Sequence, residues 1–201
     1  MTENSFFATL LSRRSIRRYE PRPVPDELVE QILTAAMWAP SAHNRQPWRF
    51  VVTREMDTKE RLARAMGSKL QRDLEADGVP EAVIAKDVNR SYERITKAPV
   101  LVLICLSMLD MDRYPDELRQ RNEWIMAAQS TAMAGENLLL AAHALGLGAC
   151  WMCAPLFCPD TVKETLALPD DWEPQGLITL GFPAETKEKS RQPLETRVVY
   201  R

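Results

Sequence analysis

The apolar positions along this chain follow two different spacings. Val29, Ile32, Leu33 and Ala36 recur at the 3.6-residue spacing of an amphipathic helix, which predicts a helix over 26–38 that ends before Pro40. The same spacing predicts a helix over 58–76, and we also expect helices over 5–12, part of 77–97, 122–145 and 160–167. Short apolar and β-branched runs, which are typical of buried strands, predict strands over 48–53, 100–106, 149–153 and 176–182.

Two of these patterns predict more than a local element. The segment 122–145 carries apolar residues on nearly every side, so we expect it to be the buried core helix. The tail ends in the strand-like run 197–200, and no nearby segment has a pattern that would pair with it. We therefore expect the tail to dock on a second subunit. Helices outweigh strands and do not alternate strictly with them, so the chain is predicted to be α+β rather than a Rossmann domain.

The composition is that of one soluble globular domain, which we expect to span residues 1–201. The chain is 45% apolar and 27% charged, and its 26 Lys and Arg against 28 Asp and Glu leave no global charge that would attract nucleic acid. No uncharged apolar run reaches the roughly 20 residues of a membrane span, and the N-terminus lacks a signal-peptide pattern. Four cysteines do not suggest a secreted disulfide scaffold. We expect a cytoplasmic protein with no nucleic-acid or membrane partner.

The first candidate for chemistry is the basic run Arg13-Arg14-Ser15-Ile16-Arg17-Arg18, which follows the first predicted helix. Its guanidinium groups and hydroxyl are suited to hold a phosphate dianion through charge-assisted hydrogen bonds. Short arginine runs are also common as solvated surface, so the run by itself leaves both readings open. A second basic cluster, Lys187 to Leu194, lies near the C-terminus and would usually be solvated as well.

The second candidate is the loop 39–48, between a predicted helix and a predicted strand. Pro40 and Pro47 restrict its backbone, whereas Ser41, Asn44 and Gln46 offer hydrogen-bonding groups. Turn chemistry alone explains the prolines but not so many polar side chains. The loop is therefore a candidate binding segment.

The cysteines suggest a different chemistry. Cys150 and Cys153 have the C-x-x-C spacing of redox dithiols and of half a zinc site. A zinc site needs two more ligands, and the two histidines, His43 and His143, are isolated in the sequence. A redox pair would begin a helix, whereas this pair lies on a predicted strand. We therefore expect structural thiols and no metal site. We expect His143 to be a hydrogen-bonded core histidine. His43 is the histidine that is better placed to contact a flavin or a substrate.

Taken together, these segments resemble the nitroreductase family over almost the whole chain. No single motif is specific, but their order along 180 residues is. The motifs are RRSIR (13–17), PSAHNRQPWRF (40–50), Glu123-Trp124 with Gln129 and Asn137-Leu138-Leu139, Gly146-Leu147-Gly148-Ala149, Leu180-Gly181-Phe182, and KSRQPL (189–194). The resemblance implies an α+β fold with a central, mainly antiparallel sheet flanked by helices, and a C-terminal strand exchanged with the partner subunit.

The resemblance also implies a homodimer with FMN at its interface. Arg13 and Ser15, with Lys189 and Arg191, would hold the phosphate, and Arg14 belongs to the same binding motif. Arg17 would lie near the pyrimidine edge of the flavin, where a fixed cation stabilises the negative charge that reduction places there. Two groups complete the implied site: Pro40, Ser41 and Asn44 from the opposite subunit, and the backbone around Met152 and Cys153 facing the hydride-accepting nitrogen. Some family members have an asparagine on the helix after the first strand that contacts the flavin. Residues 66–72 contain no clear equivalent, so we assign no flavin contact there.

The implied activity is that of an FMN-dependent NAD(P)H oxidoreductase with a ping-pong mechanism. FMN carries the chemistry, so no catalytic side chain is required. The acceptor would be a small conjugated molecule such as a nitroaromatic or a quinone, in a pocket lined by 68–92 and 107–118, with His43 and Tyr114 as contacts. The sequence leaves open the acceptor, the choice between NADH and NADPH, and the role of the two cysteines.

Two alternatives remain. The segments 151–160 and 168–176 are also similar to the flavin domain of deazaflavin-coenzyme biosynthesis proteins, in which reduced FMN acts on a biosynthetic intermediate. The chain departs from that pattern because it lacks the ligase domain that those proteins often carry. The second alternative, from another class, is a non-catalytic protein that binds or sequesters flavin.

Overall fold

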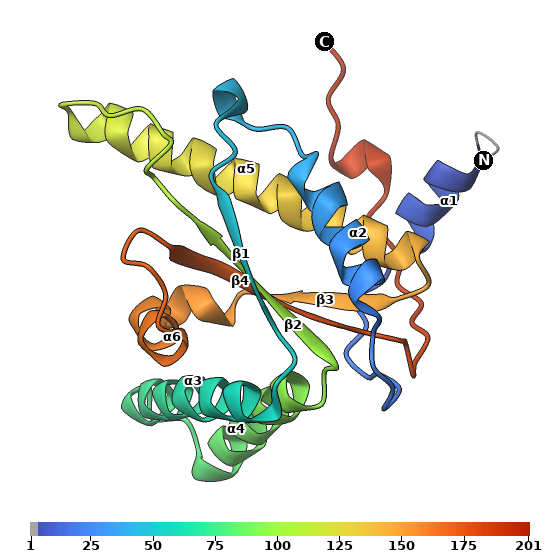
Figure 1. Ribbon diagram of the computed structural model, residues 1–201, viewed down its shortest axis with the longest axis vertical. Helices are drawn as coiled ribbons and strands as arrows, with labels where there is room; N and C mark the ends of the chain where they lie inside the picture. The colour runs from blue at the N-terminus through green and yellow to red at the C-terminus, as the bar shows by residue number, and fades with distance from the viewer. Residues whose placement is uncertain (1–3) are drawn as a thin grey trace.

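The computed structural model describes residues 4–201 as helices packed on both faces of one sheet (Figure 1). The helices are α1 (Asn4–Ser12), α2 (Asp26–Met37), α3 (Met56–Ala76), α4 (Glu81–Thr96), α5 (Glu117–Ala144) and α6 (Pro159–Leu166). The strands are β1 (Trp48–Thr53), β2 (Val100–Leu106), β3 (Gly148–Met152) and β4 (Glu173–Gly181). Short 3-10 turns lie at η1 (Ala42–Asn44), η2 (Ala154–Phe157) and η3 (Leu194–Thr196). The predicted α+β class is confirmed.

The sheet has the strand order β1-β2-β4-β3, and all of its neighbouring strands are antiparallel. β2 is buried along its whole length, as its uninterrupted apolar sequence predicts. Because the order places β2 and β4 inside, β1 and β3 form the two edges. The predicted antiparallel sheet is therefore correct, and the edge beside β3 becomes important for the site.

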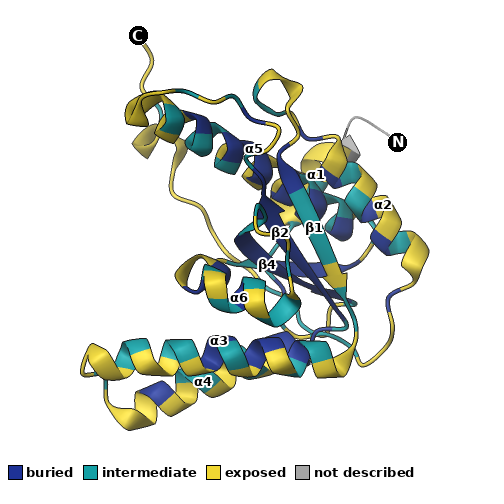
Figure 2. Cartoon of the chain, turned by 60° about the vertical axis from the view of Figure 1, so that its left-hand side comes forward, coloured by how far each residue is buried: buried dark blue, intermediate teal, exposed yellow. Residues whose placement is uncertain are grey.

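Two helical layers cover the two faces of the sheet (Figures 1 and 2). Side chains alternate along β2, so Val102 faces α2 and α5 with Ile32 and Leu138, whereas Leu101 faces α3 with Leu62. The helices α2 and α5 thus lie on one face, and α3, α4 and α6 lie on the other. Each face has its own apolar core.

The long helix α5 begins five residues earlier than predicted. The Asp116 side chain accepts a hydrogen bond from the backbone N–H of Arg119 at 2.9 Å, which satisfies an otherwise unpaired donor at the helix start. α5 buries the sides that face the sheet, where Gly135 packs against Trp151, and α2, where Leu138 packs with Ile32. Its opposite side is exposed in the single chain and mixes polar with apolar residues: Gln129, Ala132, Met133 and Glu136. The expected core helix is therefore buried along one part of its surface within one chain, and the rest of its surface is exposed.

The C-terminal tail runs away from the body of the molecule after η3 (Figure 1). The run 197–200 forms no strand with any described residue of this chain, and Val199 and Tyr200 are 79% and 85% exposed. The predicted strand therefore does not form within one chain.

Candidate functional site

The N-terminal basic motif is fixed along the outer edge of β3. After α1 ends at Ser12, the chain runs parallel to β3, and the backbone N–H of Ile16 donates to the carbonyl of Ala149 at 3.0 Å. Gly148 allows this close approach, since a Cβ added there would lie 2.8 Å from the Ile16 side chain. The motif is thus held by the sheet and is not a free basic arm.

The segment after β4 holds the same motif from the other side. The backbone N–H of Arg17 donates to Glu185 Oε1 at 2.8 Å, and that of Ala184 donates to the carbonyl of Arg18 at 3.0 Å. Lys187 in turn pairs with Glu185 at 3.4 Å. The two ends of the chain therefore meet through Glu185, and the basic residue that pairs with Glu185 is Lys187, whereas the sequence pointed to Lys189 and Arg191.

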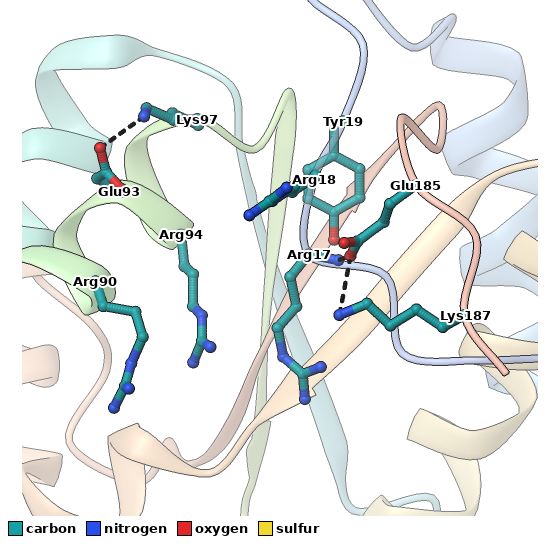
Figure 3. Close-up of a pocket in the computed structure, with 9 residues that line it drawn as sticks. All are labelled: Arg17, Arg18, Tyr19, Arg90, Glu93, Arg94, Lys97, Glu185 and Lys187. Carbon is teal, nitrogen blue, oxygen red and sulfur yellow. Dashed lines mark hydrogen bonds and ion pairs between the residues drawn. The ribbon is translucent and has the colours of Figure 1, made fainter. Parts of the chain in front are cut away.

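A cavity of about 410 Å³ opens between this junction and α4 (Figure 3). Figure 3 shows the guanidinium groups of Arg17, Arg90 and Arg94 extending toward the same open space. Arg17 comes from the N-terminal motif, whereas the other two lie one turn apart on α4. We call this cavity the arginine pocket. Its lining residues are Arg17, Arg18, Tyr19, Arg90, Glu93, Arg94, Lys97, Glu185 and Lys187.

The arginine pocket is strongly positive. Its two carboxylates are already engaged, Glu93 with Lys97 at 2.7 Å and Glu185 with Lys187. Within residues 4–201, neither Arg17 nor Arg94 pairs with a carboxylate. Burial, and then the positive charges of Arg17 and Arg90, lower the pKa of Arg94. Like charges that are not neutralised by the protein are suited to bind an anion.

Tyr19 forms the back of the pocket. Its hydroxyl lies 2.6 Å from the carbonyl oxygen of Ile16 and 2.7 Å from Thr179 Oγ1, and so ties the N-terminal motif to β4. Burial raises the pKa of Tyr19, so the phenol stays neutral at physiological pH. Tyr19 therefore positions the motif without adding charge.

The remaining arginines of the N-terminal motif lie outside the arginine pocket. Arg13 pairs loosely with Glu136 of α5, at 3.8 Å. Arg14 donates to the carbonyls of Leu11 and Arg13, and its buried Nε has no partner among the described residues. The half-buried Ser15 lies beside Cys150.

The C-terminal pair Lys189 and Arg191 is exposed. The one hydrogen bond that Arg191 makes within the described chain is to the carbonyl of Ser190, at 3.3 Å. Within one chain, Arg13 extends to Glu136, Ser15 lies at Cys150 and Arg17 lines the arginine pocket. Neither Lys189 nor Arg191 is brought to any of the three.

The loop 40–46 has unusual backbone geometry. His43, Asn44 and Gln46 all have positive φ angles, of 49°, 56° and 51°, which are uncommon for residues other than glycine. Ser41 Oγ accepts from the backbone N–H of Gln46 at 3.0 Å, while Pro40, His43 and Asn44 are exposed. Such strain persists only where the surroundings enforce it and often marks a functional segment.

The loop and the N-terminal motif touch α5 at different places. The backbone N–H of Ala42 donates to Ser130 Oγ, whereas Ser12 Oγ lies 2.7 Å from Nε2 of His143. Residues 130 and 143 are about 20 Å apart along a helix axis. The loop therefore contacts α5 far from Ser12, whereas the Arg13 side chain reaches Glu136, which is about 9 Å from residue 130 along the helix axis.

Met152 and Cys153 lie at the end of β3. Met152 is the last strand residue and half-buried, whereas Cys153 follows the strand and is exposed. The prediction that Cys153 lies within a strand is wrong, because the chain turns into η2 there. All four cysteines are free thiols, and burial raises the pKa of Cys150 and raises that of Cys105 to about 12. Among the described residues, no group of three His, Cys, Asp or Glu is placed to hold a metal.

Tyr114 and His143 lie at two other cavities. Tyr114 lines a separate cavity of about 500 Å³ that shares no lining residue with the arginine pocket. His143 is half-buried and lines a cavity of about 360 Å³. Its ring is hydrogen-bonded to Ser12, as expected for a satisfied histidine, but it lies outside the core.

Sequence reasoning missed Arg90 and Arg94, and it placed Lys187 in the second basic cluster without giving it a role in binding. Arg90 and Arg94 have the i, i+4 spacing that places two side chains on one helix face, and this signal is visible in the sequence. It does not reveal what the face meets, because that depends on how α4 packs beside the N-terminal motif.

Residues 10–182 match the model of the Nitroreductase family. A Methanothermobacter thermautotrophicus protein assigned as an NADH dehydrogenase/NAD(P)H nitroreductase is 33% identical over 176 residues, covering 87% of this chain and 75% of that protein. An NADH dehydrogenase of Thermus thermophilus is 33% identical over 216 residues, covering 95% and 93%. No described helix has the length and apolar character needed to cross a membrane.

Two solved structures resemble the chain over nearly its whole length. A Desulfovibrio desulfuricans protein assigned as a nitroreductase and crystallised with FMN has a TM-score of 0.77 and 30% identity, covering 100% of this chain and 98% of that one. A BluB-like flavoprotein of Clostridium difficile has a TM-score of 0.79 and 26% identity, covering 98% of each.

Proposed function

Because the chain belongs to the nitroreductase family of oxidoreductases, we propose that it is an FMN-dependent enzyme that passes electrons from NAD(P)H to a small acceptor. The observation that carries this proposal is the arginine pocket beside a motif fixed on the edge of β3. The FMN complex of the Desulfovibrio desulfuricans relative supports the choice of cofactor.

The residues present fit FMN. A phosphate needs charge-assisted donors, which Arg13 and Ser15 offer, and the buried Nε of Arg14 is a further unpaired donor in the same motif. The pyrimidine edge needs a fixed cation, which Arg17 offers, since no described carboxylate neutralises it. When bound, FMN supplies the hydride chemistry.

The protein's own residues bind and orient in this proposal. Arg13 and Ser15 would hold the phosphate, and Lys189 and Arg191, which are exposed on the segment that follows Glu185, would join them when FMN binds. The backbone at Met152 and Cys153, where β3 ends, would contact the flavin ring. We further propose a ping-pong cycle in which NAD(P)H and the acceptor occupy the same pocket in turn.

We also propose a homodimer in which each flavin site uses both chains. The exposed side of α5 and the distance along α5 between the contacts of the loop 40–46 and of Ser12 support this arrangement. Ser41 and Asn44 would then be supplied by the opposite subunit. The run 197–200 would pair with a partner subunit, for which the unpaired edge of β1 is available.

The cofactor is tested by purifying the protein and titrating it with FMN, followed by absorbance. We expect a yellow protein that oxidises NADH or NADPH when a nitroaromatic or a quinone is added. A colourless protein that does not bind added FMN would overturn the proposal. A protein that binds FMN but reduces none of the nitroaromatic, the quinone and a deazaflavin intermediate would instead support a non-catalytic role in sequestering flavin.

The dimer is tested by sedimentation of the FMN-bound protein at micromolar concentration. We expect a dimer of about 46 kDa, twice the 22.9 kDa of one chain. Deleting residues 195–201 should loosen the dimer and weaken FMN binding together. A stable monomer that keeps its flavin would refute the shared site.

A further inference from the structure

A second cavity, of about 840 Å³, lies between the segment 21–24, the start of α3 and the end of α4. It shares Tyr19 and Lys97 with the arginine pocket, but none of the residues proposed to bind FMN lines it. Its volume is in the range of small-molecule sites. We call it the lysine cavity, after the buried Lys59 in its wall.

Most of the wall of the lysine cavity is apolar. Its apolar residues come from three separate segments: Pro21, Pro23 and Val24, then Met56, then Ala98 and Pro99. Within this wall lies the charged side chain of Lys59, which is only 4% exposed. An apolar wall with a few polar groups is typical of sites for organic ligands.

Lys59 is buried without a neutralising charge. Its Nζ donates to the carbonyl oxygen of Ala98 at 2.8 Å, which uses one of the three ammonium protons. Within residues 4–201 it pairs with no carboxylate. It also lies in the first turn of α3, where the helix dipole favours negative charge, and burial lowers its pKa. A buried ammonium group of this kind is costly unless an anion pairs with it.

The other charged side chains of the lysine cavity are already paired. Each has a partner of opposite charge: Arg22 with Glu20, Arg54 with Asp26, Glu60 with Arg64 and Lys97 with Glu93. One further donor is free, because the Nε of Arg54 is buried and has no hydrogen-bond partner among the described residues. The charge that remains to be neutralised is therefore the single charge of Lys59.

We propose that the lysine cavity is a second ligand site, which binds a monocarboxylate with an apolar body and pairs the carboxylate with Lys59. One negative charge neutralises the one unpaired cation through charge-assisted hydrogen bonds. Burial of the apolar body against the wall removes both surfaces from water. The site is separate from the flavin residues and does not rest on the proposed function.

The test uses the FMN-loaded protein and two probes with the same apolar body, octanoate and octanamide. Calorimetric titration measures the dissociation constant of each, and the flavin absorbance is recorded in parallel. We expect octanoate to bind about 10-fold more tightly, because only the acid offers a charge to Lys59. Neither probe should change the flavin absorbance. A titration with 2-naphthoate distinguishes an aliphatic from an aromatic body.

Lys59→Met keeps an apolar stem and removes the charge. It should raise the dissociation constant of octanoate about 10- to 100-fold and leave that of octanamide within about 3-fold. Lys86→Met is the matched control, because Lys86 is an exposed lysine of α4 that does not line the cavity. It should change neither constant. The FMN affinity of both variants should stay near that of the wild type.

A second pair of variants leaves the buried lysine in place. Met56 lines the cavity but is 52% exposed, so the fold should tolerate polar substitutions there. Met56→Glu places a carboxylate at the cavity, which would repel the ligand or pair with Lys59 itself. It should weaken octanoate binding about 10-fold relative to Met56→Gln. Octanamide should bind both variants alike.

Equal affinity of the wild type for octanoate and octanamide would overturn the inference, as would an unchanged octanoate constant in Lys59→Met. A wild type that binds neither probe would show that the cavity is closed in the assembled protein, with the same consequence. A change in flavin absorbance with octanoate that persists in Lys59→Met would place the acid at the flavin instead. FMN binding and NAD(P)H oxidation are measured separately, so these results leave the proposed function standing.

Discussion

The backbone N–H of Arg17 donates to Glu185 Oε1 at 2.8 Å, and this hydrogen bond joins the first tenth of the chain to its last. Glu185 also pairs with Lys187, so one carboxylate orders both the N-terminal motif and the start of the C-terminal segment. The wall of the arginine pocket depends on this junction.

We therefore predict that Glu185→Ala accelerates hydrogen exchange at the Arg17 amide about 10- to 100-fold, since a hydrogen bond to a charged group contributes about 1.5–3 kcal/mol. Exchange measured by mass spectrometry on peptides covering 13–20 checks this. Glu188→Ala removes an exposed carboxylate of the same segment and should have no effect. Unchanged exchange in Glu185→Ala would show that the β3 contact alone holds the motif.

A second prediction concerns the phosphate. Arg13→Ala and Arg191→Ala should each weaken FMN affinity about 10- to 100-fold, because each removes one charge-assisted contact. The fold should survive, because Arg191 is exposed and Arg13 makes only a long ion pair. Titration of the apoprotein with FMN measures this, and Arg72→Ala, which changes an exposed arginine of α3, is the control. An unchanged constant in both variants would place the phosphate elsewhere.

The third prediction is a pH dependence of stability. Burial, and then the charges of Arg13 and Arg14, lower the pKa of His143 in the folded protein. The unfolded chain, with a pKa of about 6.5, therefore takes up the proton first as the pH falls. Stability from this residue is present above pH 6.5 and is lost as the pH falls toward the folded pKa.

Urea unfolding at pH 7.5 and at pH 5 measures the effect. His143→Gln should reduce the loss of stability between these two values, whereas His43→Gln, which changes an exposed histidine, should not. An equal loss in wild type and His143→Gln would contradict the prediction.

The fourth prediction concerns the packing of α5 on the sheet. A Cβ added at Gly135 would lie 2.1 Å from the ring of Trp151, so Gly135→Ala should lower the free energy of unfolding by about 1–3 kcal/mol. Gly67→Ala, whose Cβ would lie 3.3 Å from Val88, should change it by less than about 1 kcal/mol. Chemical denaturation compares the two. Similar stability for both variants would mean that Trp151 moves aside at little cost.

The sequence by itself determined the elements and the family. Val100 to Leu106 is a short apolar run with three β-branched residues, which favours a buried strand, and the residues of α2 show their apolar face through spacing alone. These features are local, because period and composition act over a few neighbouring residues. The motif order likewise sufficed for the nitroreductase family, which the match over residues 10–182 confirms.

The tertiary structure decided which charges meet. Arg17 and Arg94 are 77 positions apart in the sequence, and nothing local indicates that α4 packs beside the N-terminal motif. Similarly, three basic residues follow Glu185 closely, and only the Arg17–Glu185 contact selects Lys187 as the one at the pocket. Pairing of distant charges depends on how rigid elements are placed by the burial of their apolar faces. A pattern of residues along the chain specifies those faces, but not which polar side chains their packing brings together.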